Sequence, residues 1–205
     1  MNIVVACNDS QWVELNASSP DAPWLRVDKA GDFSQHPDAI AFFDLTEEAA
    51  DHDHSSVNKP VIINAVIHTL KKINAPDHIL RINGWNGFLQ RKTWELAGKV
   101  NDDILTVFKT IHKKMVAVAD EPGLISARVL SMIINEAWFA YESSVSSKEE
   151  IDTAMKLGTN YPHGPFEWGD KIGLENIAAL LLTLSVADAR YKPCSLLLES
   201  CNRQS

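Results

Sequence analysis

The run Asp51-His52-Asp53-His54 holds the side chains in this chain that are best suited to binding a metal ion. Carboxylate oxygens and imidazole nitrogens are common metal ligands, but a site also needs ligands that converge and an ordered shell of residues around them. The neighbouring residues are polar and typical of a loop. We therefore predict that this run is a solvated loop and that the chain has no metal ligands.

The strongest helix signals lie between residues 120 and 173. Pro122 precedes a long apolar helix, which the spacing predicts from Leu124 to Ser144. Ser147 and Glu150 follow it with the spacing of a capping box, in which each side chain accepts a hydrogen bond from the other residue's backbone N–H. The pattern predicts a second helix directly after the first.

Glycine and proline divide the rest of this region. Gly158 is predicted to end the second helix in the left-handed conformation, which costs glycine little. Pro165 fits the first position of a third helix, and Gly173 precedes a fourth that runs to about Ala187. The tail from Lys192 is predicted to be poorly ordered.

The first of these helices has apolar residues on two sides. Ile125 and Val129 lie on one side, and Ile134 and Trp138 lie on the other. A helix that is apolar on two sides is expected to pack between neighbours. We therefore predict a small, compact, all-α domain.

The composition is ordinary for a globular protein and excludes some function classes. The chain has 205 residues, of which 45% are hydrophobic and 22% charged. Its net charge of -8 and its lack of basic clusters argue against nucleic acid as a partner. No apolar run reaches the roughly 20 residues that span a bilayer, and the N-terminus has no signal-peptide pattern. We predict no membrane association and a cytoplasmic location.

The chain contains three cysteines, Cys7, Cys194 and Cys201, whose spacing is not that of a metal site. Reduced thiols are expected in the cytoplasm. A disulfide between Cys194 and Cys201 is the less favoured alternative.

The first 119 residues alternate between short apolar runs and helical connections. Helices are predicted from Ser10 to Leu15 and from Ala65 to Lys72. Strands alternating with helices indicate a parallel sheet covered by helices, and the short connections indicate a reduced one. The five strand candidates are Asn2–Cys7, Trp24–Val27, Asp38–Leu45, Lys59–Asn64 and Ile79–Gly84.

A strand over Lys92–Leu96, a helix from Asn101 to about Lys114 and a strand over Met115–Ala119 complete this region. Residues 1–119 are therefore predicted to form a reduced Rossmann-like α/β domain. Residues 120–205 are predicted to form the helical domain.

Four blocks of the helical region resemble the C-terminal domain of 3-hydroxyacyl-CoA dehydrogenases. Their order and spacing over roughly fifty residues carry the resemblance, which implies an NAD-dependent oxidoreductase family of fatty acid metabolism. It also implies a homodimer, because this domain supplies the dimer contact in the family. The blocks are Asp120–Arg128, Asn135–Ala137, Ile151–Gly158, and Pro162–Asp170 with Ile172–Leu174.

The family's cofactor motif is missing from the first strand–helix turn. Dehydrogenases of this kind have Gly-x-Gly-x-x-Gly there, so that backbone N–H groups approach a pyrophosphate. Here the turn reads Cys7-Asn-Asp-Ser-Gln-Trp, and Gly31 is the only glycine before Gly84. Asp9 would add negative charge, and a plain turn capped by Asp9 or Ser10 is expected. We predict no cofactor; NAD is expected only if the chain is a divergent oxidoreductase.

The family's catalytic residues are only partly matched. By resemblance, Asn83 occupies the position of the catalytic histidine, Asn86 matches an asparagine, and Glu95 matches the glutamate that orients the histidine. Ala127 stands where the family has an asparagine that contacts the substrate. An amide cannot act as a base near neutral pH, whereas an imidazole can. Glu95 and Asn86 are therefore predicted to be vestigial.

Two further positions bear on the chemistry that the resemblance implies. The hydroxyl-rich segment that follows the fourth strand in the family is replaced by Ile63-Asn-Ala-Val-Ile. His68 lies near the family's cleft and could act as a displaced base, but a surface histidine without a role is favoured. The losses of base, cofactor turn and substrate contacts coincide, which suggests that the dehydrogenase reaction was abandoned.

Three functions remain open at this stage. The first is a dehydrogenase-like protein without dehydrogenase activity that binds an acyl-CoA-like ligand or a partner through the interdomain cleft. The second is a divergent NAD(P)-dependent oxidoreductase acting on 3-hydroxyacyl-CoA. The third is a dimerising structural or assembly protein, for which the apolar run Ile177–Leu184 would serve as an interface helix, unless it is buried within the monomer.

Overall fold

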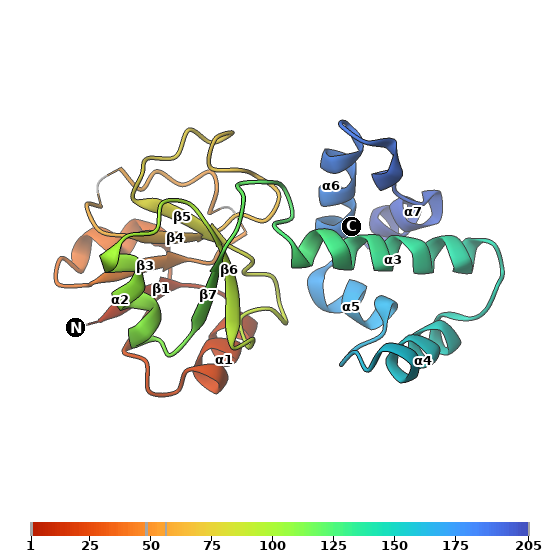
Figure 1. Ribbon diagram of the computed structural model, residues 1–205, viewed down its shortest axis with the longest axis horizontal. Coiled ribbons are helices and arrows are strands. Elements are labelled where there is room, and N and C mark those ends of the chain that lie inside the picture. The colour runs from red at the N-terminus through yellow and green to blue at the C-terminus, as the bar shows by residue number, and fades with distance from the viewer. Residues whose placement is uncertain (1, 48, 56, 205) are drawn as a thin grey trace. The chain divides into compact units, whose positions relative to one another are not determined.

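The computed structural model describes residues 2–47, 49–55 and 57–204. Contacts divide the chain into two compact units, Met1–Leu124 and Ile125–Ser205. The first unit is a sheet with helices and long loops, and the second unit consists of helices (Figure 1). This division matches the predicted α/β and all-α classes of the two halves.

The first unit is built on one seven-stranded sheet in the order β2-β1-β3-β4-β5-β6-β7. The first five strands pair in parallel, with Ile3 beside Trp24 on one side and beside Ala41 on the other. The strands are β1 Ile3–Ala6, β2 Trp24–Val27, β3 Ala41–Asp44, β4 Val61–Asn64, β5 Ile79–Ile82, β6 Thr93–Ala97 and β7 Lys114–Ala117. All predicted strands are confirmed, with boundaries shifted by a few residues.

The sheet is not parallel throughout, contrary to the prediction. β6 pairs antiparallel with β5, opposing Arg81 to Ala97 and Ile82 to Leu96, and β7 then runs parallel to β6. The reason lies in the connection from Ile82 to Thr93, which contains turns and no helix. A parallel neighbour needs a longer crossover than this segment provides.

Both faces of the sheet are buried, but they are covered differently. α1 (Asp9–Ser18) and α2 (Asp102–Thr110) lie over the face that carries Val5, Phe43 and Leu80. The opposite face, with Phe42 among its buried residues, packs against the 3-10 helix η1 (Ala30–Gln35) and against loops. A Rossmann-like sheet is thus retained with few helices on one side.

The predicted helix over Ala65–Lys72 is absent, and turns occupy this segment. Backbone groups of this segment form hydrogen bonds with side chains that are distant in the sequence. The Asp120 carboxylate accepts hydrogen bonds from the N–H groups of Leu70 and Lys71, each at 3.1 Å. The fully buried Arg81 guanidinium donates to the Ala65 carbonyl at 2.8 Å and to the Asp120 carboxylate at 2.6 Å. These contacts hold the segment in a non-helical conformation.

The second unit has five α-helices and a short 3-10 helix among its described residues. They are α3 Ser126–Glu142, α4 Lys148–Thr159, α5 Pro165–Ile172, α6 Leu174–Ser185, η2 Ala189–Tyr191 and α7 Ser195–Gln204. The capping box of Ser147 and Glu150 is present, and Pro165 is the first residue of α5. Gly158 does not end α4: the left-handed position is Asn160, with φ 55°. Asparagine tolerates this conformation better than most residues, so the helix continues past the glycine.

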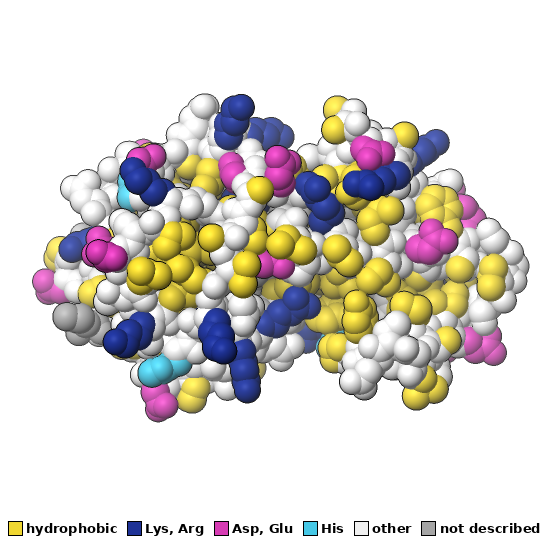
Figure 2. Space-filling view, viewed as in Figure 1, with side chains coloured by type: hydrophobic (Ala, Val, Ile, Leu, Met, Phe, Trp, Pro, Cys, Tyr) yellow, Lys and Arg dark blue, Asp and Glu magenta, His cyan; other side chains and the backbone are white. Residues whose placement is uncertain are grey.

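One apolar side of α3 is buried, and the other is exposed at its start and half-buried at Met132, Ile133 and Ala140. Ile134 and Trp138 are buried, whereas Ile125 and Val129 are 55% and 52% exposed, contrary to the prediction for that side. Figure 2 shows hydrophobic side chains gathered over α3. α6 is mostly buried within the unit, with Leu182 as its exposed apolar residue. Most residues of the Ile177–Leu184 run are therefore buried within the unit, as the alternative to an interface helix predicted.

The C-terminal tail is ordered as α7, contrary to the prediction. Asn135 on α3 is 2% exposed and fixes the approach to this helix. Its side chain donates to the Lys192 carbonyl at 3.0 Å and accepts from the Cys194 N–H at 2.8 Å. Leu197 on α7 is fully buried. The tail is therefore held by the hydrogen bonds of the Asn135 side chain and by apolar packing. Composition could not indicate this, since the partner lies 57 residues away from Lys192.

Candidate functional site at the carboxyl end of the sheet

The turn between β1 and α1 satisfies its own hydrogen-bonding groups. Asn8, and not Asp9 or Ser10, is the N-cap: its side chain accepts from the Gln11 N–H at 2.8 Å. The Gln11 side-chain oxygen accepts from the Asn8 N–H at 3.0 Å. This reciprocal pair uses two of the N–H groups that a helix N-terminus otherwise offers to an anion.

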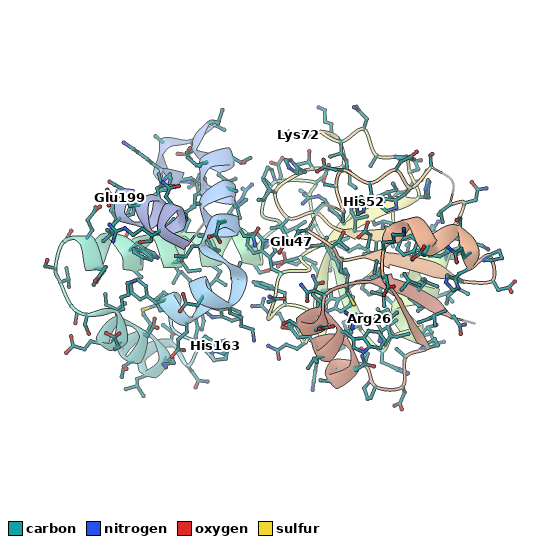
Figure 3. All side chains as sticks on the ribbon, turned by 180° about the vertical axis from the view of Figure 1, so that it is seen from behind. Arg26, Glu47, His52, Lys72, His163 and Glu199 are labelled. Atoms are coloured by element: carbon teal, nitrogen blue, oxygen red, sulfur yellow. The ribbon has the colours of Figure 1, made fainter. Side chains whose placement is uncertain are left out.

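A second interaction crosses the outside of the same turn. Arg26 on β2 donates to the Asp9 carboxylate at 2.7 Å and to the Cys7 carbonyl at 3.0 Å. Hydrogen bonding to Asp9 raises the pKa of Arg26. Burial raises the pKa of the Cys7 thiol to about 11, against the opposing charge of Arg26, so the thiol is protonated at neutral pH. Arg26 is labelled in Figure 3 beside α1.

The carboxyl ends of β3, β4 and β5 are joined by buried amide side chains. The Gln11 amide nitrogen donates to the carbonyls of Leu45 at 2.7 Å and Gly84 at 2.9 Å. The Asn64 side-chain oxygen accepts from the Gly84 N–H at 3.0 Å. A Cβ at position 84 would lie 2.9 Å from the Asn64 side chain, so only glycine fits there. Sequence reasoning missed both amides; the one available signal was their position directly after buried strands.

Asn83 lies within this edge of the sheet. It is 7% exposed, and its side-chain oxygen accepts from the Trp85 N–H at 3.2 Å. Its amide nitrogen is buried without a hydrogen-bond partner. Asn83, which the resemblance aligns with a histidine, is thus a buried amide that holds a local turn.

Glu95 lies close to Asn83 through the pairing of β5 and β6. The β5–β6 ladder ends at Ile82 opposite Leu96, and the next residues along the two strands are Asn83 and Glu95. Glu95 is half-buried on β6, where it pairs with Val116 of β7. Asn86 is half-buried in the turn that follows β5. The antiparallel pairing thus brings the backbones of Asn83 and Glu95 to neighbouring positions on the two strands.

The other two predicted positions, Ala127 and His68, lie outside the strands of this edge. Ala127 lies in the first turn of α3, in the second unit, and is fully buried. His68 is half-buried in the turn segment that replaces the predicted helix.

The two histidines of the Asp51–His54 run are held against the sheet, contrary to the prediction of a solvated loop, whereas Asp51 and Asp53 are exposed as predicted. His54 is 4% exposed and stacks on the Phe33 ring, with 6.0 Å between ring centroids. His52 forms an ion pair with the fully buried Asp44 carboxylate, with Nδ1 at 2.6 Å from Oδ2. Burial raises the pKa of Asp44, but polar contacts with His54, Thr46 and His52 outweigh it, and the net pKa is lowered. The anchor was missed because Asp44 is the last residue of an apolar strand.

The first unit also contains a buried lysine, Lys113, next to the Trp94 ring. Lys113 is 6% exposed, and its ammonium donates to the carbonyls of Leu89 at 3.0 Å and Arg91 at 2.8 Å. It also lies 5.0 Å from the centre of the Trp94 ring. Burial lowers the pKa of Lys113 to about 8, although the charge of Glu14 acts in the opposite direction.

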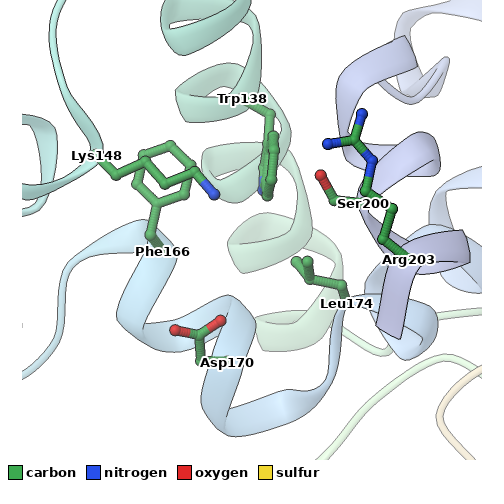
Figure 4. A pocket seen from close by; sticks show the side chains of 7 residues that line it. All are labelled: Trp138, Lys148, Phe166, Asp170, Leu174, Ser200 and Arg203. Carbon is green, nitrogen blue, oxygen red and sulfur yellow. The ribbon is translucent and has the colours of Figure 1, made fainter. Parts of the chain in front are cut away.

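The helical unit has a pocket of its own, with a volume of about 220 Å³. The Lys148 ammonium lies 4.2 Å from the centre of the Trp138 ring and 5.3 Å from that of Phe166. A cation over aromatic faces is stabilised by the rings, so Lys148 has an internal structural role here. The lining residues, drawn in Figure 4, are Trp138, Lys148, Phe166, Asp170, Leu174, Ser200 and Arg203.

The three cysteines are free and buried, so Cys194 and Cys201 do not form a disulfide. Across the described ranges, no helix combines the length and hydropathy that crossing a membrane requires.

Comparison with known proteins gives the ancestry of the helical unit. Residues 123–204 match the family model described as 3-hydroxyacyl-CoA dehydrogenase, C-terminal domain. The 3-hydroxyadipyl-CoA dehydrogenase of Escherichia coli (strain K12) is 47% identical over 87 residues, which cover 42% of this chain and 18% of that protein. The 3-hydroxybutyryl-CoA dehydrogenase of Clostridioides difficile is 39% identical over 124 residues, covering 57% of this chain and 44% of that protein.

The fold of the whole chain is also similar to solved dehydrogenases. The (S)-3-hydroxybutyryl-CoA dehydrogenase of Ralstonia eutropha aligns with a TM-score of 0.72 and 19% identity, over 96% of this chain and 91% of that chain. Residues 123–204 are therefore a domain of the 3-hydroxyacyl-CoA dehydrogenase C-terminal type, and the chain as a whole shares the fold of these dehydrogenases. It covers less than half the length of the two curated relatives named above.

Proposed function

We propose that this protein keeps the scaffold of 3-hydroxyacyl-CoA dehydrogenases without their dehydrogenase reaction. The observation that carries the proposal is the burial of Asn83, the residue that the sequence resemblance aligns with the family's catalytic histidine. Removal of the hydroxyl proton needs a group with a pKa near the working pH, and an amide has none. Asn83 also holds the Trp85 N–H, so it serves the local turn instead.

The β1–α1 turn supports the same proposal, because it does not suit a dinucleotide. In the family's manner of binding, free N–H groups at this turn hold a pyrophosphate. Here Asn8 and Gln11 occupy two of these donors, and Asp9 places a carboxylate beside them. A pyrophosphate would have to break this cap and would lie near a negative charge. We therefore propose that NAD is not bound in the family's manner.

The proposal is tested by oxidation of NADH with acetoacetyl-CoA at high protein concentration. We expect no turnover above the background of a heat-treated sample. The alternative, a divergent oxidoreductase acting on 3-hydroxyacyl-CoA, requires protein-dependent turnover in either direction. Such turnover that saturates with substrate would overturn the proposal.

A retained acyl-CoA-like ligand is tested separately by calorimetric titration with acyl-CoA esters of several chain lengths. Heat with a stoichiometry of one, together with a thermal shift, would support a binding protein. Absence of both across all chain lengths would remove the ligand and leave the scaffold proposal.

One observation favours a further role in assembly. Ile125 and Val129 expose about half of their surface at the start of α3, and Phe139 is 37% exposed on the same helix. Exposed apolar residues gathered on one helix are typical of an interface, and a self-complementary twofold contact is the commonest one. We propose that a second copy of this chain covers this face.

A further inference from the structure

We propose that Asp44, His52 and His54 form a binding site for a divalent transition-metal ion such as Zn²⁺. One ligand atom from each of these residues lies within 4.8 Å of the others. Ligands on one zinc ion lie within roughly 4.2 Å of each other, because each bond is about 2.1 Å long. The three groups therefore need only small rotations to converge on one ion.

The site is anchored on the sheet. Asp44 is the last residue of β3, and its side chain is fully buried. Its Oδ1 accepts from the Thr46 N–H at 3.2 Å and from the Thr46 hydroxyl at 2.6 Å, which leaves Oδ2 facing the two histidines. A ligating carboxylate oriented by a second hydrogen-bonded shell is characteristic of metal sites. A solvated loop would have no such shell.

The two histidines approach Asp44 Oδ2 from the loop that follows β3. His52 Nδ1 lies 2.6 Å from Oδ2, and His54 Nε2 lies 3.4 Å from it. A buried carboxylate between two imidazoles is a donor set that suits zinc and other first-row dications. The ion would replace the proton that His52 and Asp44 now share in their hydrogen bond.

His54 supplies an independent indication of a missing partner. The side chain is 3% exposed, and Nε2 makes no hydrogen bond of good geometry, despite its 3.4 Å approach to Asp44. Stacking on Phe33 fixes the ring, so this nitrogen cannot turn freely to another acceptor. A buried polar atom without a partner is costly, and a metal ion would satisfy it.

The site would leave one coordination position for water or an exogenous ligand. Three protein ligands are typical of zinc sites that are open to exchange. His52 retains 33% side-chain exposure, and it provides the route to solvent. Figure 3 labels His52 on the loop above the sheet. This position is at the carboxyl end of the parallel strands, where α/β folds bind their ligands.

The test is a titration of metal-free protein with Zn²⁺ in competition with a chromophoric chelator. We expect one ion per chain, and His52→Gln and His54→Gln should each weaken binding at least about 100-fold. His112→Asn is the matched control: His112 is exposed with φ 55°, a conformation that asparagine adopts readily. Co²⁺ substitution should give visible absorption bands in the wild-type protein and in the control.

Far-UV circular dichroism of the metal-free variants checks that they fold. His52→Gln is the decisive variant, because His52 is partly exposed and its loss leaves no buried cavity. No binding of Zn²⁺ or Co²⁺ to the wild-type protein at micromolar concentrations would overturn the proposal. Equal binding by the wild-type protein and both variants would also overturn it, because the ion would then lie elsewhere.

Discussion

Arg81 holds the segment Asp120–Glu121 in place through its buried guanidinium. It donates to the Asp120 carboxylate and to the carbonyls of Ala65 and Glu121, the last at 2.7 Å. Asp120 opens the block that resembles the dehydrogenase family. Its pKa is lowered because hydrogen bonds from Lys71, Arg81 and Leu70 outweigh its desolvation. The block's first residue therefore has a structural role.

Arg81→Met should lower the free energy of unfolding by about 3–5 kcal/mol, because it leaves several buried acceptors without a donor. Urea unfolding followed by tryptophan fluorescence measures the change. The control is Lys99→Met, which removes an ion pair with Asp77 whose side chains are 70% and 82% exposed. Exposed pairs contribute under about 1 kcal/mol. Equal losses in the two variants would contradict the role assigned to Arg81.

Lys113 makes stability depend on pH at the alkaline end. Its pKa is about 8 in the folded chain against 10.5 in the unfolded chain, so the unfolded state binds more protons between these values. Stability from this group therefore rises as pH increases through that window, and it is lost as pH falls through 8.

Lys113→Met removes this dependence. The free energy of unfolding of the wild type minus that of the variant should increase by about 1–3 kcal/mol between pH 7.5 and 10.5. Chemical denaturation at several pH values measures it, and taking the difference cancels the other titrating groups. A difference that stays constant with pH would show that Lys113 does not titrate in this range.

At the scale of elements, α5 is capped by a residue of another helix. Asp152 on α4 accepts from the N–H groups of Phe166 at 2.8 Å and Glu167 at 3.1 Å. Gly164 stands at the N-cap, where a Cβ would lie 2.3 Å from the Asp152 carboxyl carbon. Two of the blocks that carry the family resemblance, Ile151–Gly158 and Pro162–Asp170, thus contact each other. Asp152 of the first caps the helix of the second, and Gly164 of the second leaves space for the Asp152 side chain.

This arrangement predicts a strong coupling between the two positions. Gly164→Ala should destabilise the wild type by more than about 2 kcal/mol through overpacking. Asp152→Gly should cost about 2 kcal/mol through loss of the cap and the insertion of a helical glycine. In the double variant the added methyl finds space, so the two costs should not add. Additive thermal denaturation data would disprove the steric explanation.

Local sequence signals predicted most elements, because strands and caps depend on neighbouring residues. The capping box at Ser147 and the first residue of α5 at Pro165 are examples. Two of the errors share one physical cause, which is a hydrogen-bonding partner far along the chain. Asp120 and Arg81 form hydrogen bonds with the segment after Ala65, which is not the predicted helix. Asn135 holds the C-terminal tail, which was predicted to be poorly ordered.

The candidate site was predicted less completely than the fold. Resemblance singled out Asn83, Asn86 and Glu95, and the β5–β6 pairing brings the backbones of the first and last of them to neighbouring positions. Gln11 and Asn64 carry no motif, since an amide that joins strand ends is specified only by the folded backbone. His54 was misread because burial of a polar loop cannot be seen without its anchor, Asp44.

At the scale of the whole molecule, the exposed face of α3 predicts self-association. Val129→Glu should shift the protein toward monomer, because an interface core tolerates a charge poorly. Light scattering across micromolar concentrations measures the mass. Val13→Glu is the control, since Val13 is 65% exposed on α1 in the other unit. A wild-type monomer at these concentrations would reject the assembly role.

The amide bridge of Gln11 has an evolutionary consequence. Because its side chain accepts from the Asn8 N–H and donates to the carbonyls of Leu45 and Gly84, a glycine here would remove three hydrogen bonds at once. A glycine-rich turn would therefore have to arise through intermediates less stable than the present chain. A series of single substitutions toward a nucleotide-binding turn would pass through these less stable intermediates. Folding stability by itself thus favours the present turn over a glycine-rich one.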